Sequence, residues 1–178
     1  MSIVLFIFIN LLFIFAFFIL INYILGSIVS RKFQKGVNET AIHFTGKSVK
    51  QLTNKQAHYS YNSAHAPNGE NDFWAIYYDC RKCDLRIKGT IPKARFWSVT
   101  AYDKFARPLP DFIMDKTVTK EEGENYVIYL TTRPSGRPNE INVSKCPVGE
   151  AVVRVSLMEK QLDREKFTPM IREVNISN

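Results

Sequence analysis

The amino-terminal segment from Ile3 to Ile28 contains no charged side chain, so its hydrophobic positions are continuous. A helix needs about 20 apolar residues to cross the hydrocarbon core of a bilayer, and this segment is long enough to do so. A cleaved signal peptide has a basic start and a shorter apolar run of roughly 7–15 residues. Here no Lys or Arg precedes Arg31, and the run is longer. The pattern predicts an uncleaved transmembrane helix over residues 1–30.

The next segment, residues 31–56, has little hydrophobic periodicity, and we expect it to be a tether between the membrane and a folded domain. A short helix is possible over Gln56–Ala66, ending before Pro67-Asn68-Gly69, which is a turn signal. After Gly69 the pattern changes to a period of two residues, which is typical of half-buried strands.

Short alternating or β-branched runs then follow one another, separated by turn residues. The predicted strands are Asp72–Asp79, Cys83–Lys88, Arg95–Tyr102, Tyr126–Thr131 and Val148–Leu157. Between and after them we expect a turn at Gly89–Pro92, a corner at Asp103–Pro110, a loop at Arg133–Asn139, a short helix or turn at Glu159–Lys166, and a tail that packs on the sheet through Met170, Ile171 and Val174. This spacing predicts an all-β domain over residues 57–178, an antiparallel β-sandwich or open barrel.

The strand over Arg95–Tyr102 has two faces of different character. Trp97, Val99 and Ala101 share one parity and should face the interior, packed on Leu85, Ile87 and the Tyr126–Thr131 strand. The opposite face should then carry Phe96, Ser98, Thr100 and Tyr102.

The segment around this strand resembles the bacterial and viral family called domain of unknown function 1214. The matching motif residues are Pro92, Ala94, Arg95, Phe96, Trp97, Ser98, Thr100, Tyr102 and Asp103. Weaker matches extend the resemblance over roughly residues 57 to 175. It implies a β-sandwich resembling a jelly roll, and short family members are similar in plan, with one amino-terminal membrane segment. The chain departs from the family at Glu140–Pro147, where many members carry an Asn-Trp-Leu-Pro-like segment. The resemblance implies no reaction.

The charge distribution bears on where the domain lies. All 24 basic and 17 acidic residues follow the apolar segment, and the net charge is +7. Arg31, Lys32 and Lys35 come directly after the span, so the positive-inside rule favours a cytoplasmic domain. The same cations could lie on anionic lipid headgroups. An amino-terminal apolar segment is also what the export machinery recognises, so an extracytoplasmic domain remains the alternative.

Cys80 and Cys83 are the first candidates for chemistry. Two thiolates at this spacing can form one edge of a zinc site, completed by Cys146, His58 or His65, or they can form a redox pair. However, residues i and i+3 of a regular strand face opposite ways. We therefore favour a packing role for these thiols and no cofactor, with zinc or another metal as the alternative.

Arg95, Tyr102 and Asp103 are the polar residues of the motif and the candidate ligand-binding residues. Arg95 and Asp103 bracket one strand and should lie about 25 Å apart, so they cannot form one catalytic pair. The structural interpretation is that Asp103 begins a turn and Arg95 pairs with a neighbouring strand. The functional one is an arginine that binds an anionic ligand at the edge of the sandwich.

No nucleophile motif, phosphate loop or dinucleotide fingerprint occurs in the chain. We therefore expect a non-enzymatic binding or accessory subunit held at the lipid bilayer. Its partner would be another membrane protein, a second copy, or a small or anionic ligand. A membrane tether disfavours nucleic-acid binding. The alternative is a membrane-tethered enzyme or metal protein that uses Cys80 and Cys83 with Cys146 or a histidine.

Overall fold

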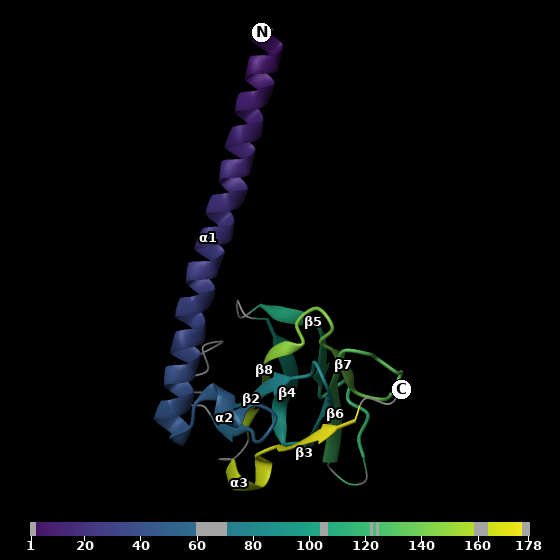
Figure 1. Ribbon diagram of the computed structural model, residues 1–178. Helices are drawn as coiled ribbons and strands as arrows, with labels where there is room; N and C mark the ends of the chain where they lie inside the picture. The colour runs from purple at the N-terminus through teal and green to yellow at the C-terminus, as the bar shows by residue number, and fades with distance from the viewer. Residues whose placement is uncertain are drawn as a thin grey trace. The chain divides into compact units, whose positions relative to one another are not determined.

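The computed structural model describes most of the chain (Figure 1), namely residues 3–59, 71–103, 107–121, 123, 125–158 and 164–175. It divides into two compact units, Met1–Gly36 and Val37–Asn178, which are considered separately below.

The first unit is formed by helix α1 (Ile3–Thr45), whose last turns belong to the second unit. Within the described residues, Asn10–Glu39 is the one helical stretch long and apolar enough to cross a membrane, with a mean hydropathy of 2.5 over its most apolar window. None of that window is buried. A helix wrapped in lipid would have this property, because its apolar side chains need no protein partner. The structure thus contains the expected apolar helix near the amino terminus.

The predicted tether over residues 31–56 is helical over much of its length, because α1 continues without interruption to Thr45. The residues after the span include Lys, Gln and Glu, which have good helix propensity, and the single Gly36 does not end the helix. The possible helix from Gln56 is also wrong at its start, because His58–Tyr59 forms strand β1. The rest of that segment lies outside the described residues.

The second unit is made mostly of strands arranged in two sheets. Its elements are α2 (Val49–Leu52), β1 (His58–Tyr59), β2 (Asn71–Asp79), β3 (Asp84–Thr90), β4 (Ala94–Tyr102), β5 (Pro108–Met114), β6 (Asn125–Thr131), β7 (Glu140–Asn142), β8 (Val148–Met158), α3 (Arg164–Phe167) and β9 (Met170–Val174). One sheet has the order β1-β2-β8-β4-β5 and is antiparallel throughout. The other has the order β7-β6-β3-β9 and is mixed, because β6 and β7 run parallel.

All five strands predicted from alternation are confirmed, and the loop at Arg133–Asn139 contains no strand. The corner at Asp103–Pro110 is wrong at its end, because β5 begins at Pro108. β5 is an edge strand, where proline costs no ladder hydrogen bond on the open side. The tail does join a sheet as β9, and Ile171 packs against the core as predicted, but Met170 is exposed.

The core contains side chains from both sheets. Trp97, Val99 and Ala101 of β4 are buried, as predicted, in one cluster with Leu85 and Ile87. The same cluster includes Ile128 and Leu130 of β6. The Trp97 ring is stacked on Tyr126, with 4.9 Å between ring centroids. The alternation of β4 therefore assigns the core face correctly.

Gly89 explains why β3 extends into the predicted turn at Gly89–Pro92, as far as Thr90. It lies opposite Tyr126 in the register of β3 and β6. A Cβ atom at residue 89 would lie 2.6 Å from Cζ of Tyr126 and also collide with the hydroxyl. The ring of Tyr126 thus occupies the space that a side chain at residue 89 would need. Glycine is therefore required here, and the strand continues through it.

A second, smaller cluster covers part of the outer face of β2. Ala41 of α1 and Leu52 of α2 are fully buried and pack with Ala75 and Tyr77. The amide oxygen of Asn38 accepts a hydrogen bond from Val49 N at 3.0 Å, which fixes α2 against the end of α1. These helical segments thus cover the part of this sheet face around Ala75 and Tyr77.

Asn54 joins this helical segment to both sheets. Its φ of 57° places it in the left-handed region, where asparagine is tolerated better than most residues. Its side-chain oxygen accepts from Asp79 N at 2.8 Å, and its nitrogen donates to Asp79 O at 2.9 Å. The same nitrogen donates to Oε1 of Glu173 in β9 at 2.9 Å. One amide therefore binds the end of β2 and a strand of the other sheet.

We expect Trp97→Ala to lower the free energy of unfolding by about 3–5 kcal/mol, because it leaves a large cavity beside Tyr126. That is a large share of the roughly 5–15 kcal/mol that stabilises a typical domain. Urea unfolding of the full-length protein in detergent, followed by circular dichroism, measures the change.

Two further variants serve as controls for Trp97→Ala. Trp97→Phe should cost less than about 1.5 kcal/mol, since it keeps an aromatic ring. It also removes an indole N–H that is buried without a hydrogen-bond partner among the described residues. Ser98→Ala, on the opposite face, should shift the unfolding midpoint little. An unchanged midpoint for Trp97→Ala would show that its ring is not part of the core.

Candidate functional site

The strand register defines a grid of side chains on the outer face of the five-stranded sheet, the face opposite to Trp97. Each row crosses β2, β8 and β4 through directly paired residues, and three of the four rows continue to β5. The rows are Asn71–Ser156–Phe96, then Phe73–Arg154–Ser98–Met114, then Ala75–Val152–Thr100–Phe112, and last Tyr77–Glu150–Tyr102–Pro108. Since α1 and α2 cover Ala75 and Tyr77, the open part of the grid lies over β8, β4 and β5.

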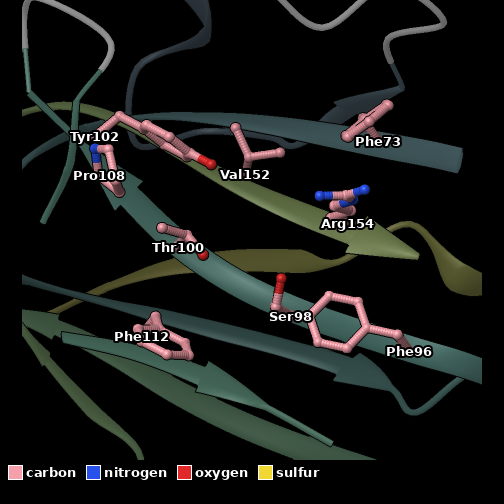
Figure 2. Close-up of a pocket in the computed structure, with 9 residues that line it drawn as sticks. All are labelled: Phe73, Phe96, Ser98, Thr100, Tyr102, Pro108, Phe112, Val152 and Arg154. Atoms are coloured by element: carbon pink, nitrogen blue, oxygen red, sulfur yellow. The ribbon is translucent and has the colours of Figure 1, made fainter. Parts of the chain in front are cut away.

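This open part contains a pocket with a volume of about 280 Å³ (Figure 2). Its lining residues are Phe73, Phe96, Ser98, Thr100, Tyr102, Pro108, Phe112, Val152 and Arg154. Aromatic rings and one proline form much of the wall, and hydroxyl groups and one guanidinium supply the polar atoms. Binding sites for small molecules have this composition, with a mostly apolar lining and a few polar groups that fix orientation.

Arg154 is the one charged side chain among the described residues that line the pocket. Its Nε and Nη2 atoms lie 3.4 Å from Oδ1 of Asn71, which is longer than the usual N–H···O range. The guanidinium also lies over the ring of Phe73, 6.0 Å from its centroid. Within the part of the chain that the structure describes, Arg154 forms no ion pair. It is a half-buried cation whose donors are only weakly engaged.

Two hydroxyl groups of β4 lie beside this cation. Ser98 is paired directly with Arg154, and Thr100 is paired with Val152 in the next row. Neither hydroxyl forms a hydrogen bond with another described residue, and both line the pocket. They can therefore donate to or accept from a bound molecule.

Tyr102 lies in the fourth row, at the end of the pocket away from Arg154 (Figure 2). Burial raises the pKa of its phenol, Arg154 lowers it, and Glu150 raises it. The group is thus a neutral hydroxyl near neutral pH. Tyr102 is a sequence-predicted site residue that the structure does place in the pocket.

Arg95 and Asp103, the other two predicted ligand-binding residues, do not line the pocket. Arg95 is exposed near the start of β4. Asp103 accepts hydrogen bonds from N and Nε of Arg107 at 3.0 and 2.9 Å, and forms an ion pair with that arginine. Asp103 therefore binds Arg107, and the residues between them, where the structural interpretation places a turn, lie outside the described residues. A ligand at Arg95 stays a prediction that the structure does not test.

The three cysteines are free. Cys80 is fully buried, and its Sγ atom lies 3.6 Å from Leu130 O. Burial raises its pKa to about 12, with the charges of Cys83 and Asp84 adding to the effect. Burial also raises the pKa of Cys83, as do the carboxylates of Glu173 and Asp79. This is the opposite of the lowered pKa that a reactive thiol pair requires.

The metal site suggested by Cys80 and Cys83 has no third ligand within the part of the chain that the structure describes. Among the described residues, no group of three or more His, Cys, Asp and Glu side chains could hold a metal ion. His58 is buried and stacked on Tyr77, with 5.3 Å between ring centroids. Burial lowers its pKa, and Glu150 opposes this shift. His65 lies outside the described residues.

The predicted membrane-surface residues Arg31, Lys32 and Lys35 are exposed on α1. They lie in the same unit as the apolar helix. Their side chains are thus accessible, and contact with lipid headgroups stays a prediction.

Comparisons with known proteins give information on the fold alone. No protein-family model and no curated protein matches the chain. An uncharacterized protein from Burkholderia cenocepacia is similar over 84% of this chain and 41% of its own, with 17% identity and a TM-score of 0.54. A Vibrio parahaemolyticus protein is similar over 60% of this chain and 31% of its own, with 22% identity and a TM-score of 0.45. The chain thus spans less than half of either structure, and the Burkholderia protein shares its fold.

The environment of Cys80 predicts that it does not react in the folded protein. At about pH 8, iodoacetamide should label Cys83 and Cys146 slowly and leave Cys80 unlabelled, because a buried thiol with a raised pKa supplies little thiolate. Peptide mapping by mass spectrometry measures each site, and the same reaction in guanidinium chloride is the control. Labelling of Cys80 in the native protein as fast as that of Cys146 would contradict this assignment.

Proposed function

We propose that this chain is a single-pass membrane-anchored binding module, non-enzymatic, that acts as an accessory subunit at the membrane. The observation that carries the proposal is the open pocket on the outer face of the five-stranded sheet. It combines aromatic walls, two hydroxyls without partners in the described chain, and one weakly engaged cation. A molecule could be bound and oriented by these groups, whereas the pocket lining contains no nucleophile paired with a base.

We further propose that the second unit is a β-sandwich resembling a jelly roll and that it belongs with the domain of unknown function 1214 family. Support comes from the part that the motif strand plays in the fold. Trp97 of the motif lies in the core, and Ser98, Thr100 and Tyr102 of the motif line the pocket. A motif that supplies both the packing and the lining of one pocket is what a family with a common binding surface would preserve.

The bilayer is the first partner in this proposal. The apolar helix supplies the anchor, and Arg31, Lys32 and Lys35 lie on anionic headgroups, each contributing about 1 kcal/mol near the surface. The positive-inside rule favours a cytoplasmic domain. Another membrane protein or a second copy would complete the complex.

The anchor is tested by extraction of membranes with alkaline carbonate. We expect the full-length protein to stay in the membrane pellet, because a spanning helix is held by its apolar surface rather than by charge. A high-salt wash is the control, since it releases proteins that are held by basic residues alone. Release of the intact chain by carbonate would contradict the membrane span.

The pocket is tested by fluorine NMR on the full-length protein in nanodiscs. The probes are small fluorinated aromatic compounds that are neutral, monoanionic or dianionic, and empty nanodiscs correct for partition into lipid. At least one probe should broaden in the presence of the protein. Thr100→Trp should abolish the broadening by filling the pocket, whereas Lys116→Trp at an exposed position should not. If no probe interacts with the wild-type protein, the binding function is wrong.

A further inference from the structure

We infer that the pocket selects small monoanions with a compact apolar body, such as an aromatic carboxylate, and that Arg154 binds the anionic group. This inference rests on the proposed binding function and names the class of ligand. It is carried by the register of β8 and β4 and by the distribution of charge around the pocket.

The first step concerns the position of the anionic group. Arg154 and Ser98 are directly opposite each other on antiparallel strands. Directly paired residues have Cβ atoms about 4.5–5.5 Å apart, so a guanidinium and a hydroxyl at these positions can reach the same group. A carboxylate accepts several hydrogen bonds through its two oxygens. Arg154 and Ser98 can therefore bind one carboxylate together.

The second step concerns the availability of Arg154. Its contacts to Asn71 are long, at 3.4 Å, and they go to a neutral oxygen. A hydrogen bond between a guanidinium and a carboxylate is shorter and about twice as strong as a neutral one. An incoming carboxylate can thus replace or supplement these contacts without breaking an ion pair among the described residues.

The third step concerns the number of negative charges. The pocket lining supplies one cation, and the described residues add no second one to it. Glu150 lies on the same face of β8, four residues from Arg154 and so about 13 Å along the strand. A second negative charge on the ligand would have no second cation in the pocket lining to pair with. The carboxylate of Glu150, further along β8, would not attract it either. This arrangement favours a carboxylate or sulfonate over a phosphate ester.

The fourth step concerns the rest of the ligand. Arg154 lies at the same end of the pocket as Phe73 and Phe96. The opposite end is formed by Tyr102 and Pro108 (Figure 2). Val152, Thr100 and Phe112 form the row between these ends. The volume of about 280 Å³ lies just below the roughly 300–1,000 Å³ usual for ligand pockets. A single ring fits this space better than a long acyl chain does.

The test compares three probes of nearly the same shape on the full-length protein in nanodiscs. They are 4-fluorobenzoate, 4-fluorobenzamide and 4-fluorophenyl phosphate, titrated by fluorine NMR with empty nanodiscs as the blank. We expect the benzoate to bind at least about tenfold more tightly than the neutral amide, because a charged hydrogen bond is lost with the amide. The phosphate should gain nothing over the benzoate.

Two arginine variants show whether Arg154 is the cause. Arg154→Met should reduce benzoate binding to the level of the amide, whereas Arg154→Lys should retain part of the preference, since it keeps the charge. Arg133→Met removes an exposed cation outside the pocket and should leave all three affinities unchanged. Circular dichroism checks that each variant is folded, and the comparison of probes on the wild-type protein needs no variant.

The outcomes separate this inference from the proposed function. Equal binding of benzoate and amide, or a preference that is lost in Arg133→Met and kept in Arg154→Met, would overturn the assignment of Arg154 while the pocket would still be a binding site. Tighter binding of the phosphate would overturn the selection of monoanions. Binding of none of the three probes would count against the binding function itself.

Discussion

The alternation of side chains along β4 is the constraint on which both the core and the pocket depend. Trp97 can stack on Tyr126 only if Ser98 and Thr100 face the other way. A shift of one residue in the pairing of β4 with β8 would bring the hydroxyls into the core and place the indole in solvent. The burial of one tryptophan therefore fixes the polar groups that a ligand would meet.

The strands could be predicted from the sequence because the alternation of apolar and polar side chains is visible within each segment, without knowledge of its neighbours. The pattern from Arg95 to Tyr102 could be divided into two faces, and the buried face agrees with the structure. Helix α1 was underestimated, since its last turns pack on the outer face of β2 through Ala41 rather than through a regular apolar stripe. β5 was partly missed because a strand that begins with Pro108 resembles a turn in sequence.

The pocket could not be predicted in the same way, because it depends on which strands are neighbours. Phe73 of β2, Arg154 of β8 and Ser98 of β4 come from distant parts of the chain and meet only through the order β2-β8-β4. Alternation places Arg154 opposite in parity to Val153 and Val155, which is a sign that it faces away from the core. Nothing local distinguishes it from Arg95, which was selected as a polar residue of the motif and does not line this pocket.

Asn54 limits which amino acids the fold can accept at one position. Its positive φ favours Gly, Asn or Asp. Aspartate would replace the donating nitrogen by an oxygen that faces Oε1 of Glu173 and the carbonyl of Asp79. Glycine would leave the main-chain groups of Asp79 without these partners. Asparagine alone meets both demands, so an asparagine just before the first strand would help to recognise distant relatives in which little else of the sequence is shared.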